Sequence, residues 1–440
     1  MSPTAPPEPG PSVGPVSPCP VCGFPELNDP PWSDEGGSRE TCPSCGTQFG
    51  VDDRADGIDE ARDILHEALR LSWITGGMAW QSTRPKPDGW DPVRQVDALR
   101  SERPDGMALV DLGRSGLRVT PIGLGTASIG RPAYINLGHG EDLGADRSVA
   151  AVQSQAVDVL DTAWEHGVRH VDTARSYGRA EEFVARWMEA RELGREDLTV
   201  SSKWGYEYTA DWQVDPPGPH ETKEHSVGHL RHQWGESRRL LGDRLALYQI
   251  HSATFDSGVL DDRQVHDELA AIREQGVVIG ITFSGTAQRD LVRRSMEIEY
   301  DGRFLFETVQ ATWNLLETSA EEALAEAAYE GIGVIVKEAV ANGRLTERNR
   351  LDGDQEMVEA LGDAADALGV GLDAAALSAA LAQPWSHVVL SGAATPDQLK
   401  SNLRAVGVAG DWTDRMTKVF ENFLEEPKDY WRTRSFLPWT

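Results

Sequence analysis

Four polar side chains of the kinds used in acid–base catalysis stand where short apolar segments of this chain end. Asp172 lies in H-V-D-T, Tyr177 in the R-S-Y-G that follows, Lys203 ends L-T-V-S-S-K, and His251 ends L-A-L-Y-Q-I-H. A phenol can donate a proton, a nearby ammonium lowers its pKa, a carboxylate holds that ammonium, and an imidazole can orient an oxygen that develops negative charge. Each residue alone is equally compatible with a turn cap, a snorkelling lysine or a core histidine. Together they predict a catalytic tetrad of Asp172, Tyr177, Lys203 and His251.

A second group, the four cysteines of the chain, predicts a metal centre. They form two matched turns, C-P-V-C-G and C-P-S-C-G, separated by nineteen residues. Four thiolates can converge on one soft ion when each turn closes on a glycine with positive φ, here Gly23 and Gly46. Structural zinc is expected; iron is the alternative, because the turns resemble those of rubredoxin, and buried free thiols are the simpler explanation. The expected ligands are Cys19, Cys22, Cys42 and Cys45.

The elements that must position the tetrad alternate regularly from Gly123 onward. Short apolar strands, such as I-G-L-G-T, V-V-I-G-I-T and H-V-V-L-S-G, are separated by segments with a helical period of apolar residues. Eight such strand–helix units are found, which predicts an α/β fold, a closed parallel (β/α)₈ TIM barrel. Reactive groups of such barrels lie where strands end and loops begin, and the tetrad occupies those places.

Composition divides the chain into four parts. Residues 1–18 are rich in Pro, Ser and Gly and are expected to be a disordered leader. Residues 19–100 are expected to form the Cys₄ zinc ribbon with a helical extension from Ile58 to Trp73. Trp73, Trp80 and Trp90 are expected to pack this helix onto the ribbon. The barrel covers 107–405, and 406–440 form a C-terminal tail over it.

Charge and hydropathy exclude several classes of partner. The formal net charge is -29 at pH 7, with no basic cluster, so nucleic acid is not expected as a ligand. No apolar run is long enough to cross a membrane, and the N-terminus lacks the features of a signal peptide. Cysteines confined to one metal-like cluster suit a reducing compartment, so a cytoplasmic location is expected.

The motifs D-T-A-R-S-Y-G, S-S-K-W-G and Y-Q-I-H-S resemble those of the aldo-keto reductases. The resemblance begins at the segment M-A-L-V-D-L-G-R-S-G-L-R-V-T-P, similar to the family's hairpin that closes the barrel bottom, and covers 107 to about 405. It implies NAD(P)H-dependent reduction of an aldehyde or ketone to an alcohol, with Tyr177 as general acid. The loops around the site contain aromatic residues, so the carbonyl substrate is expected to be apolar or sugar-like.

The same resemblance implies residues that bind the cofactor. Q-A-T-W-N is similar to the family's nicotinamide strand, with Gln310 on the carboxamide and Trp313 stacked on the ring, the alternative being a core tryptophan. In G-I-T-F-S-G, Thr282 replaces only in part the usual Ser-Asn pair. V-L-S-G-A-A-T-P-D-Q-L-K-S-N resembles the adenosine-phosphate end, where the residues carried over are Gly392, Thr395, Gln398 and Asn402. Thr395 stands where many members have an arginine for the 2′-phosphate; NADPH is expected, and NADH stays open.

The N-terminal region, about 17–95, resembles small cysteine-rich CPCC-type bacterial proteins, which implies no chemistry. A second hypothesis for the whole chain follows from this fusion. The barrel would be a cofactor-sensing or scaffold protein with little turnover, and the ribbon would contact a protein partner. The intact tetrad favours catalysis over this alternative.

Overall fold

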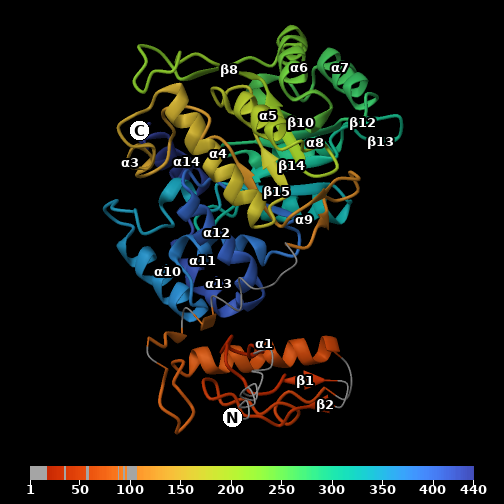
Figure 1. Ribbon diagram of the computed structural model, residues 1–440. Coiled ribbons are helices and arrows are strands. Elements are labelled where there is room, and N and C mark those ends of the chain that lie inside the picture. The colour runs from red at the N-terminus through yellow and green to blue at the C-terminus, as the bar shows by residue number, and fades with distance from the viewer. Residues whose placement is uncertain (1–16, 34–35, 56–58, 88, 93–94, 97–106) are drawn as a thin grey trace, which may run out of the picture. The chain divides into compact units, whose positions relative to one another are not determined.

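The computed structural model describes residues 17–33, 36–55, 59–87, 89–92, 95–96 and 107–440. The chain forms two compact units, Met1–Pro104 and Asp105–Thr440, each drawn in Figure 1. The expected disordered leader lies outside the described residues as far as residue 16. Ser17 is already structured, because it forms an antiparallel bridge with Leu27.

The N-terminal unit is built around the two cysteine turns. It contains the short hairpin of β1 (Trp32–Ser33) and β2 (Gly36–Gly37) and the helix α1 (Asp59–Thr75). Gly23 and Gly46 have φ of 77° and 81°, and each amide donates to the carbonyl of the first cysteine of its turn. Apolar side chains, including the three expected tryptophans, pack around the cysteines: Val21, Phe24, Leu27, Phe49, Trp73, Trp80 and Trp90.

The second unit is a closed barrel of eight parallel strands, as expected from the alternating pattern. Each strand coincides with one of the eight apolar segments, and their inward and outward faces are both buried because helices surround the barrel (Figure 1). Around the barrel the order is β10, β11, β14, β15, β16, β5, β6 and β7. The strands are β5 (Ile122–Gly125), β6 (His170–Asp172), β7 (Thr199–Trp204), β10 (Leu245–Ala253), β11 (Val278–Phe283), β14 (Thr308–Thr312), β15 (Gly333–Lys337) and β16 (Val388–Ser391).

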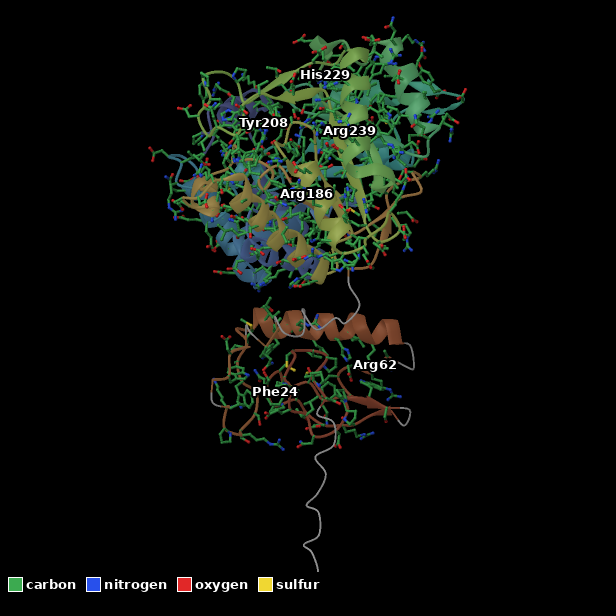
Figure 2. The ribbon with its side chains drawn as sticks, turned by 45° about the horizontal axis from the view of Figure 1, so that its top comes forward. Phe24, Arg62, Arg186, Tyr208, His229 and Arg239 are labelled. Atoms are coloured by element: carbon green, nitrogen blue, oxygen red, sulfur yellow. The ribbon has the colours of Figure 1, made fainter. Side chains whose placement is uncertain are left out.

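A helical segment follows each strand, and its apolar stripe faces the barrel. In α4, Ser148 caps the first turn, and Ala156, Val159, Leu160 and Ala163 are buried at the spacing the helical pattern predicts. Charged side chains occupy the outer faces, among them Arg186 on α5 and Arg239 on α6, both exposed (Figure 2). The helices are α4 (Val149–Glu165), α5 (Ala180–Ala190), α6 (Val227–Leu241), α7 (Arg263–Arg273), α8 (Gln288–Met296), α9 (Glu321–Tyr329), α10 (Gln355–Leu368), α11 (Leu372–Leu381) and α12 (Pro396–Val408).

A hairpin of β3 (Val110–Asp111) and β4 (Arg118–Val119) closes the end of the barrel where the strands begin. Its residues Leu112 and Val119 form one buried cluster with strand residues such as Leu247 and Val278. A Cβ on Gly333 would lie 2.6 Å from the Leu112 side chain, so the close approach of hairpin and strand requires glycine there. This confirms the predicted bottom hairpin.

Loops and the C-terminal tail cover the opposite end, where the strands finish. The loop after β5 carries the short helix α3 (His139–Leu143), and the loop after β7 carries the hairpin of β8 (Tyr206–Tyr208) and β9 (Glu221–Lys223). At the end where the strands begin, a further hairpin of β12 (Glu299–Tyr300) and β13 (Arg303–Phe304) leads into β14. The tail forms α13 (Asp414–Phe420) and α14 (Pro427–Ser435), and its last residue, Thr440, pairs through its backbone with Tyr134.

Among the described residues, no single helix is long and apolar enough to cross a membrane. The pair α10 and α11, bent by 79°, passes such a test only by length and composition. Both helices contribute buried residues to the core of the barrel unit.

Candidate active site and metal centre

The four residues of the predicted tetrad lie together at the end of the barrel where the strands finish. Lys203 Nζ donates to Asp172 Oδ2 in a buried ion pair, to the carbonyl oxygen of Thr173 at 3.1 Å, and to Tyr177 Oη at 3.4 Å. The ring of His251 stands edge-on to that of Tyr177, with centroids 5.5 Å apart. The structure therefore brings a phenol, an ammonium, a carboxylate and an imidazole into one cluster.

Two further side chains, which the sequence analysis did not single out, hold the carboxylate of Asp172. Ser201 Oγ donates to Asp172 Oδ1 at 2.6 Å, and Gln249 Nε2 donates to the same oxygen at 3.0 Å. Ser201 precedes Lys203 by two residues and Gln249 precedes His251 by two. Because alternate residues of a strand share a face, this spacing was the available signal for both.

The electrostatic state of Tyr177 differs from the one expected. Burial and the charge of Asp172 raise the pKa of Tyr177 well above its usual value, although Arg131 opposes them. The lowering expected from Lys203 is outweighed, because burial of the phenol and the carboxylate of Asp172, which is paired with Lys203, both favour the neutral form. Tyr177 is therefore a protonated hydrogen-bond donor at neutral pH.

His251 is neutral at the same pH. Burial and the positive charges of Lys203 and Lys337 hold the pKa of His251 well below its ordinary value. Its Nδ1 lies 3.4 Å from Ser176 Oγ, and its backbone carbonyl accepts from His225 Nε2 at 3.0 Å. The ring is thus fixed beside Tyr177 and can serve as a neutral donor to a substrate oxygen.

A cavity of about 550 Å³ opens onto the tetrad. Asp172, Tyr177 and His251 line one part of it, called here the catalytic end, and the first turn of α12 lines another. Three further cations also line the catalytic end. Two are paired: Arg131 with Glu221 at 2.9 Å, and Arg434 with Glu338 through both nitrogens of the guanidinium edge. The third is Lys337.

Only one of these three cations could have been predicted from the sequence. Lys337 ends the apolar segment V-I-V-K, so the strand-end rule that selected Lys203 applies to it equally. Arg131 comes from the loop after β5, and Arg434 from the C-terminal helix α14. No local pattern marks either arginine, because only the folding of loop and tail over the barrel brings them to the cavity.

A model of the aldo/keto reductase family matches residues 121–414, more than half of the 440 residues. The chain belongs to the aldo/keto reductase family. Among its curated relatives is the uncharacterized oxidoreductase YrpG of Bacillus subtilis, 27% identical over 331 residues, or 68% of this chain and 91% of the relative. The D-threo-aldose 1-dehydrogenase of a Pseudomonas species is 25% identical over 330 residues, or 68% of this chain and 94% of the relative.

Solved structures of family members share the fold. The holo form of aldo-keto reductase AKR11C1 from Bacillus halodurans superposes with a TM-score of 0.55 at 21% identity, covering 73% of this chain and 97% of that one. The match establishes the barrel architecture. The family and its relatives named as oxidoreductases support an oxidoreductase reaction in general terms.

Aldo/keto reductases use a nicotinamide cofactor, and the residues that line the cavity fit such a group. Gln310 is buried and lines the cavity, and its Nε2 has no hydrogen-bond partner among the described residues. Such an orphaned donor suits the carboxamide oxygen expected there. Gly392, Gln398 and Asn402 also line the cavity, where α12 begins.

Three of the expected cofactor residues do not line the cavity. Trp313 is 3% exposed, stands edge-on to Trp385, and donates to Glu321 at 3.0 Å. The expected stacking on the ring is therefore corrected: packing against Trp385 turns this indole into the core. Thr282 accepts from the amide of Ser252 at 2.7 Å, and Thr395 caps α12 by accepting from the amide of Gln398.

Charge is distributed unevenly along the cavity. Near the start of α12, the lining includes four carboxylates but a single cation, Arg348, among the described residues. Arg348 is already paired with Asp142, through contacts of 2.5 and 2.7 Å. This region, called the α12 end, is therefore acidic. Its carboxylates are Asp142, Glu347, Asp373 and Asp397.

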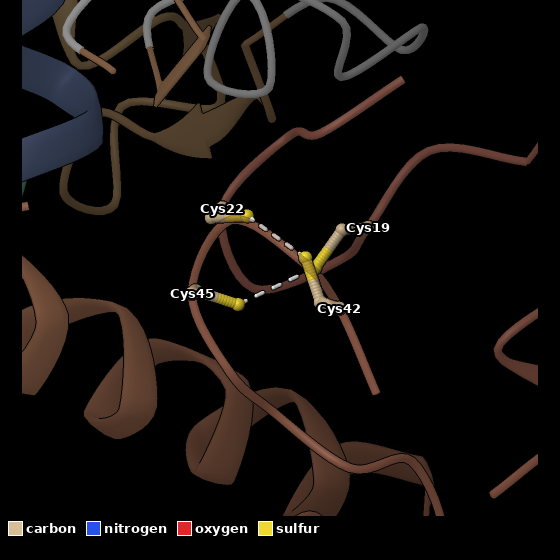
Figure 3. A group of neighbouring side chains, drawn as sticks. All are labelled: Cys19, Cys22, Cys42 and Cys45. Carbon is tan, nitrogen blue, oxygen red and sulfur yellow. Dashed lines mark hydrogen bonds between the residues drawn. The ribbon is translucent and has the colours of Figure 1, made fainter. Parts of the chain in front are cut away.

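The four cysteines of the N-terminal unit form a second candidate centre (Figure 3). Their Sγ atoms all lie within 4.8 Å of one another, with separations of 3.6 Å between Cys22 and Cys42 and 3.8 Å between Cys19 and Cys45. A tetrahedral ion with metal–sulfur bonds of about 2.3 Å places its sulfurs about 3.8 Å apart. The cluster is thus already shaped for one tetrahedral ion. Three of the thiols are buried, and that of Cys45 is half-buried.

Side chains outside the turns support the cysteine cluster. Arg70 on α1 donates to the carbonyls of Pro20 and Val21 at 2.9 and 2.8 Å, and Gln95 Nε2 donates to the carbonyl of Cys22 at 3.0 Å. These bonds tie the first turn to the helix and to the segment after it. The sequence spacing located the candidate ligands, but it gave no indication of these supports.

Proposed function

We propose that this protein reduces an aldehyde or ketone to an alcohol with NAD(P)H, with Tyr177 donating the proton. The observation that carries the proposal is the hydrogen-bonded cluster of Asp172, Lys203 and Tyr177 beside a neutral His251, open to one cavity. The cofactor, when bound, supplies the hydride for the carbonyl carbon. Everything else in the reaction is the work of the chain's own residues.

The proposed roles follow from charge and geometry. His251 orients the carbonyl oxygen by donating a hydrogen bond to it, and Tyr177 gives its proton to the same oxygen as negative charge develops there. Lys203 stabilises the phenolate that remains, and Asp172 holds the ammonium in place. Because the pKa of Tyr177 is raised before reaction, the phenol is in the protonated form that the step requires.

The catalytic end suits a hydroxylated carbonyl compound. Besides the aromatic rings of Tyr134 and Trp439, it is lined by the carboxylates of Glu221 and Glu338, which can accept hydrogen bonds from hydroxyl groups. Arg131 lies over both rings, at 5.1 and 4.8 Å from their centroids, and makes this wall rigid. We therefore favour the sugar-like alternative over an apolar carbonyl; the similarity to a D-threo-aldose 1-dehydrogenase supports this choice.

The direct test is an absorbance assay with the purified full chain. Wild-type protein is expected to oxidise the reduced cofactor only when a carbonyl compound is present, and to prefer short aldoses or hydroxyaldehydes over alkyl aldehydes of equal length. Cofactor that binds without any carbonyl-dependent oxidation across both series would contradict the enzymatic proposal. That outcome would favour the sensing or scaffold role instead.

We further propose NADH as the cofactor in place of the NADPH expected from the sequence. The two differ only in the 2′-phosphate, which would meet the acidic α12 end. The start of α12 offers few free donors to it: Pro396 has no N–H, and the amides of Ala394 and Gln398 are bonded to the side chains of Gln398 and Thr395. A carboxylate near the ribose is the arrangement that favours a free 2′-hydroxyl.

Calorimetric titration is expected to give a dissociation constant for NADH at least about tenfold below that for NADPH. Asp397, exposed in the first turn of α12, is the variant to make. Asp397→Asn should strengthen NADPH binding several-fold and leave NADH nearly unchanged. The control Asp363→Asn removes the same charge from the exposed face of α10 and should change neither. Tighter binding of NADPH by wild-type protein would refute this choice of cofactor.

A further inference from the structure

The proposed reaction makes no use of Lys337, a half-buried cation at the catalytic end. Lys337 is the last residue of β15, its side chain is 16% exposed, and it lines the cavity with Tyr177 and His251. Its Nζ donates to Ser284 Oγ at 3.1 Å and to Thr312 Oγ1 at 2.9 Å. The ammonium is thereby held between the segment after β11 and the end of β14.

The charge of Lys337 is incompletely neutralised. The nearest carboxylate, Glu338, lies 3.8 Å away, but both of its oxygens already accept hydrogen bonds from Arg434. Each other acid of the catalytic end also has a cation of its own: Asp172 has Lys203, and Glu221 has Arg131. Lys337 is therefore the surplus positive charge of this end, and a buried charge without a full counter-ion acts strongly on what binds beside it.

The same strands carry the residue that fits the nicotinamide. Gln310, with its orphaned amide nitrogen, and Thr312, the partner of Lys337, are alternate residues of β14 and share one face. In the register of β14 with β15, Gln310 pairs with Ile335 and Thr312 with Lys337. Lys337 thus lies two residues nearer the carboxyl end of the strands than the level of Gln310. This is the region where the proposed function requires the nicotinamide ring.

We propose that Lys337 makes the cofactor site bind the reduced nicotinamide more tightly than the oxidised one. The inference rests on the proposed function. The oxidised ring is a pyridinium cation and the reduced ring is neutral, while the rest of the molecule is the same in both forms. An ammonium beside the ring therefore weakens binding of the oxidised form alone. The consequence is a site biased toward carbonyl reduction and toward release of the spent cofactor.

The test compares the dissociation constants of NADH and NAD⁺ for three proteins, six constants in all, by calorimetry at pH 7 and without any turnover. Wild-type protein is expected to bind NADH at least about tenfold more tightly than NAD⁺, a difference of about 1.4 kcal/mol. Lys337→Gln keeps donors for Ser284 and Thr312 but removes the charge, so the ratio should fall to within about twofold, mainly through tighter NAD⁺ binding. The control Lys418→Met removes an exposed lysine from α13 and should preserve the wild-type ratio.

A pH series adds a second readout. Burial and the charges of Arg434 and Lys203 lower the pKa of Lys337 to about 8, against the opposing effects of Glu338 and Asp172. Lys337 is charged below that pH and neutral above it, so the wild-type ratio should shrink between pH 7 and pH 9. It should stay flat in Lys337→Gln.

The other titratable groups that face this end with a shifted pKa keep their charge state over the range. Burial and nearby cations hold the pKa of His251 well below its ordinary value, and, against the opposing effect of burial, Arg434 and Lys337 lower the pKa of Glu338 to about 2. Burial and the charge of Asp172 raise the pKa of Tyr177 well above its ordinary value.

The outcomes separate this inference from the function on which it rests. Equal affinity of wild-type protein for both forms, or an unchanged ratio in Lys337→Gln, overturns the role of Lys337 and leaves the reductase proposal intact. Failure of both forms to bind overturns the proposed function itself. Calorimetric or circular dichroism melting of the variant establishes that it is folded before the constants are compared.

Discussion

Tyr177→Phe is expected to lower the rate of carbonyl reduction by about 10²- to 10⁴-fold, the usual contribution of a positioned general acid. Phenylalanine keeps the ring that packs against His251 but removes the hydroxyl that meets Lys203. No other phenol in the described structure contacts Lys203, so the proton has no substitute donor of the same kind. The measurement is the steady-state rate with the best carbonyl substrate, at saturating cofactor.

Cofactor affinity should change by no more than about twofold in the same variant, because the hydroxyl acts on the reacting oxygen and not on the cofactor. The matched control, Tyr329→Phe, removes a hydroxyl from a side chain that is 85% exposed on α9 and should retain wild-type turnover. Equal rates in Tyr177→Phe and Tyr329→Phe would remove Tyr177 from the mechanism. If Tyr177→Phe loses cofactor binding together with the rate, Tyr177 serves in binding and not in proton transfer.

Removing the metal is expected to unfold the N-terminal unit. Purified protein should contain about one zinc ion per chain, and structural zinc in small modules contributes apparent binding free energies of about 10–16 kcal/mol at pH 7. In this unit the cysteines are part of the hydrophobic core itself, since they pack with Phe24, Phe49 and Trp73. Three buried thiols and the half-buried one of Cys45, with no ion to hold them, would leave that core without its central cross-link.

Cys42→Ser is the variant to make, because Cys42 is fully buried and its Sγ lies 3.6 Å from that of Cys22. Loss of zinc, a shift of tryptophan fluorescence, and faster proteolysis within the first 104 residues are the expected results. Ser82→Ala, outside the cluster, should retain both metal and protection. If Cys42→Ser or chelator-treated protein resists proteolysis as well as the untreated wild type does, the metal is not structural. If the purified protein is red and contains iron, the metal is iron and not zinc.

The residues that the sequence identified best are those whose signal is local. The eight strands, the tetrad at their ends and the paired cysteine turns were all visible, because periodicity and short spacing dictate which face a side chain takes. Ser201 and Gln249 were within reach of the same rule, at two residues before Lys203 and His251. Lys337, at the end of V-I-V-K, could also have been found by its place at the end of a strand.

The features that sequence reasoning missed depend on segments that are distant in the chain. Trp313 stands just after a strand, where the neighbouring indole of Trp385 decides its direction. The cations of the catalytic end come from the loop after β5 and from the last helix, and only the closure of the C-terminal tail over the barrel assembles them with β15. The α12 end is likewise acidic because four segments that are distant in the sequence each contribute one carboxylate.

The sequence by itself thus determined which groups this protein brings together: a barrel, a phenol with its lysine, aspartate and histidine, and four clustered thiols. The tertiary structure alone decided the electrostatics of these groups. Charge and solvation depend on every group within several ångströms, whatever its position in the chain. For that reason the raised pKa of Tyr177, the neutral His251 and the surplus charge of Lys337 emerged only from the folded molecule.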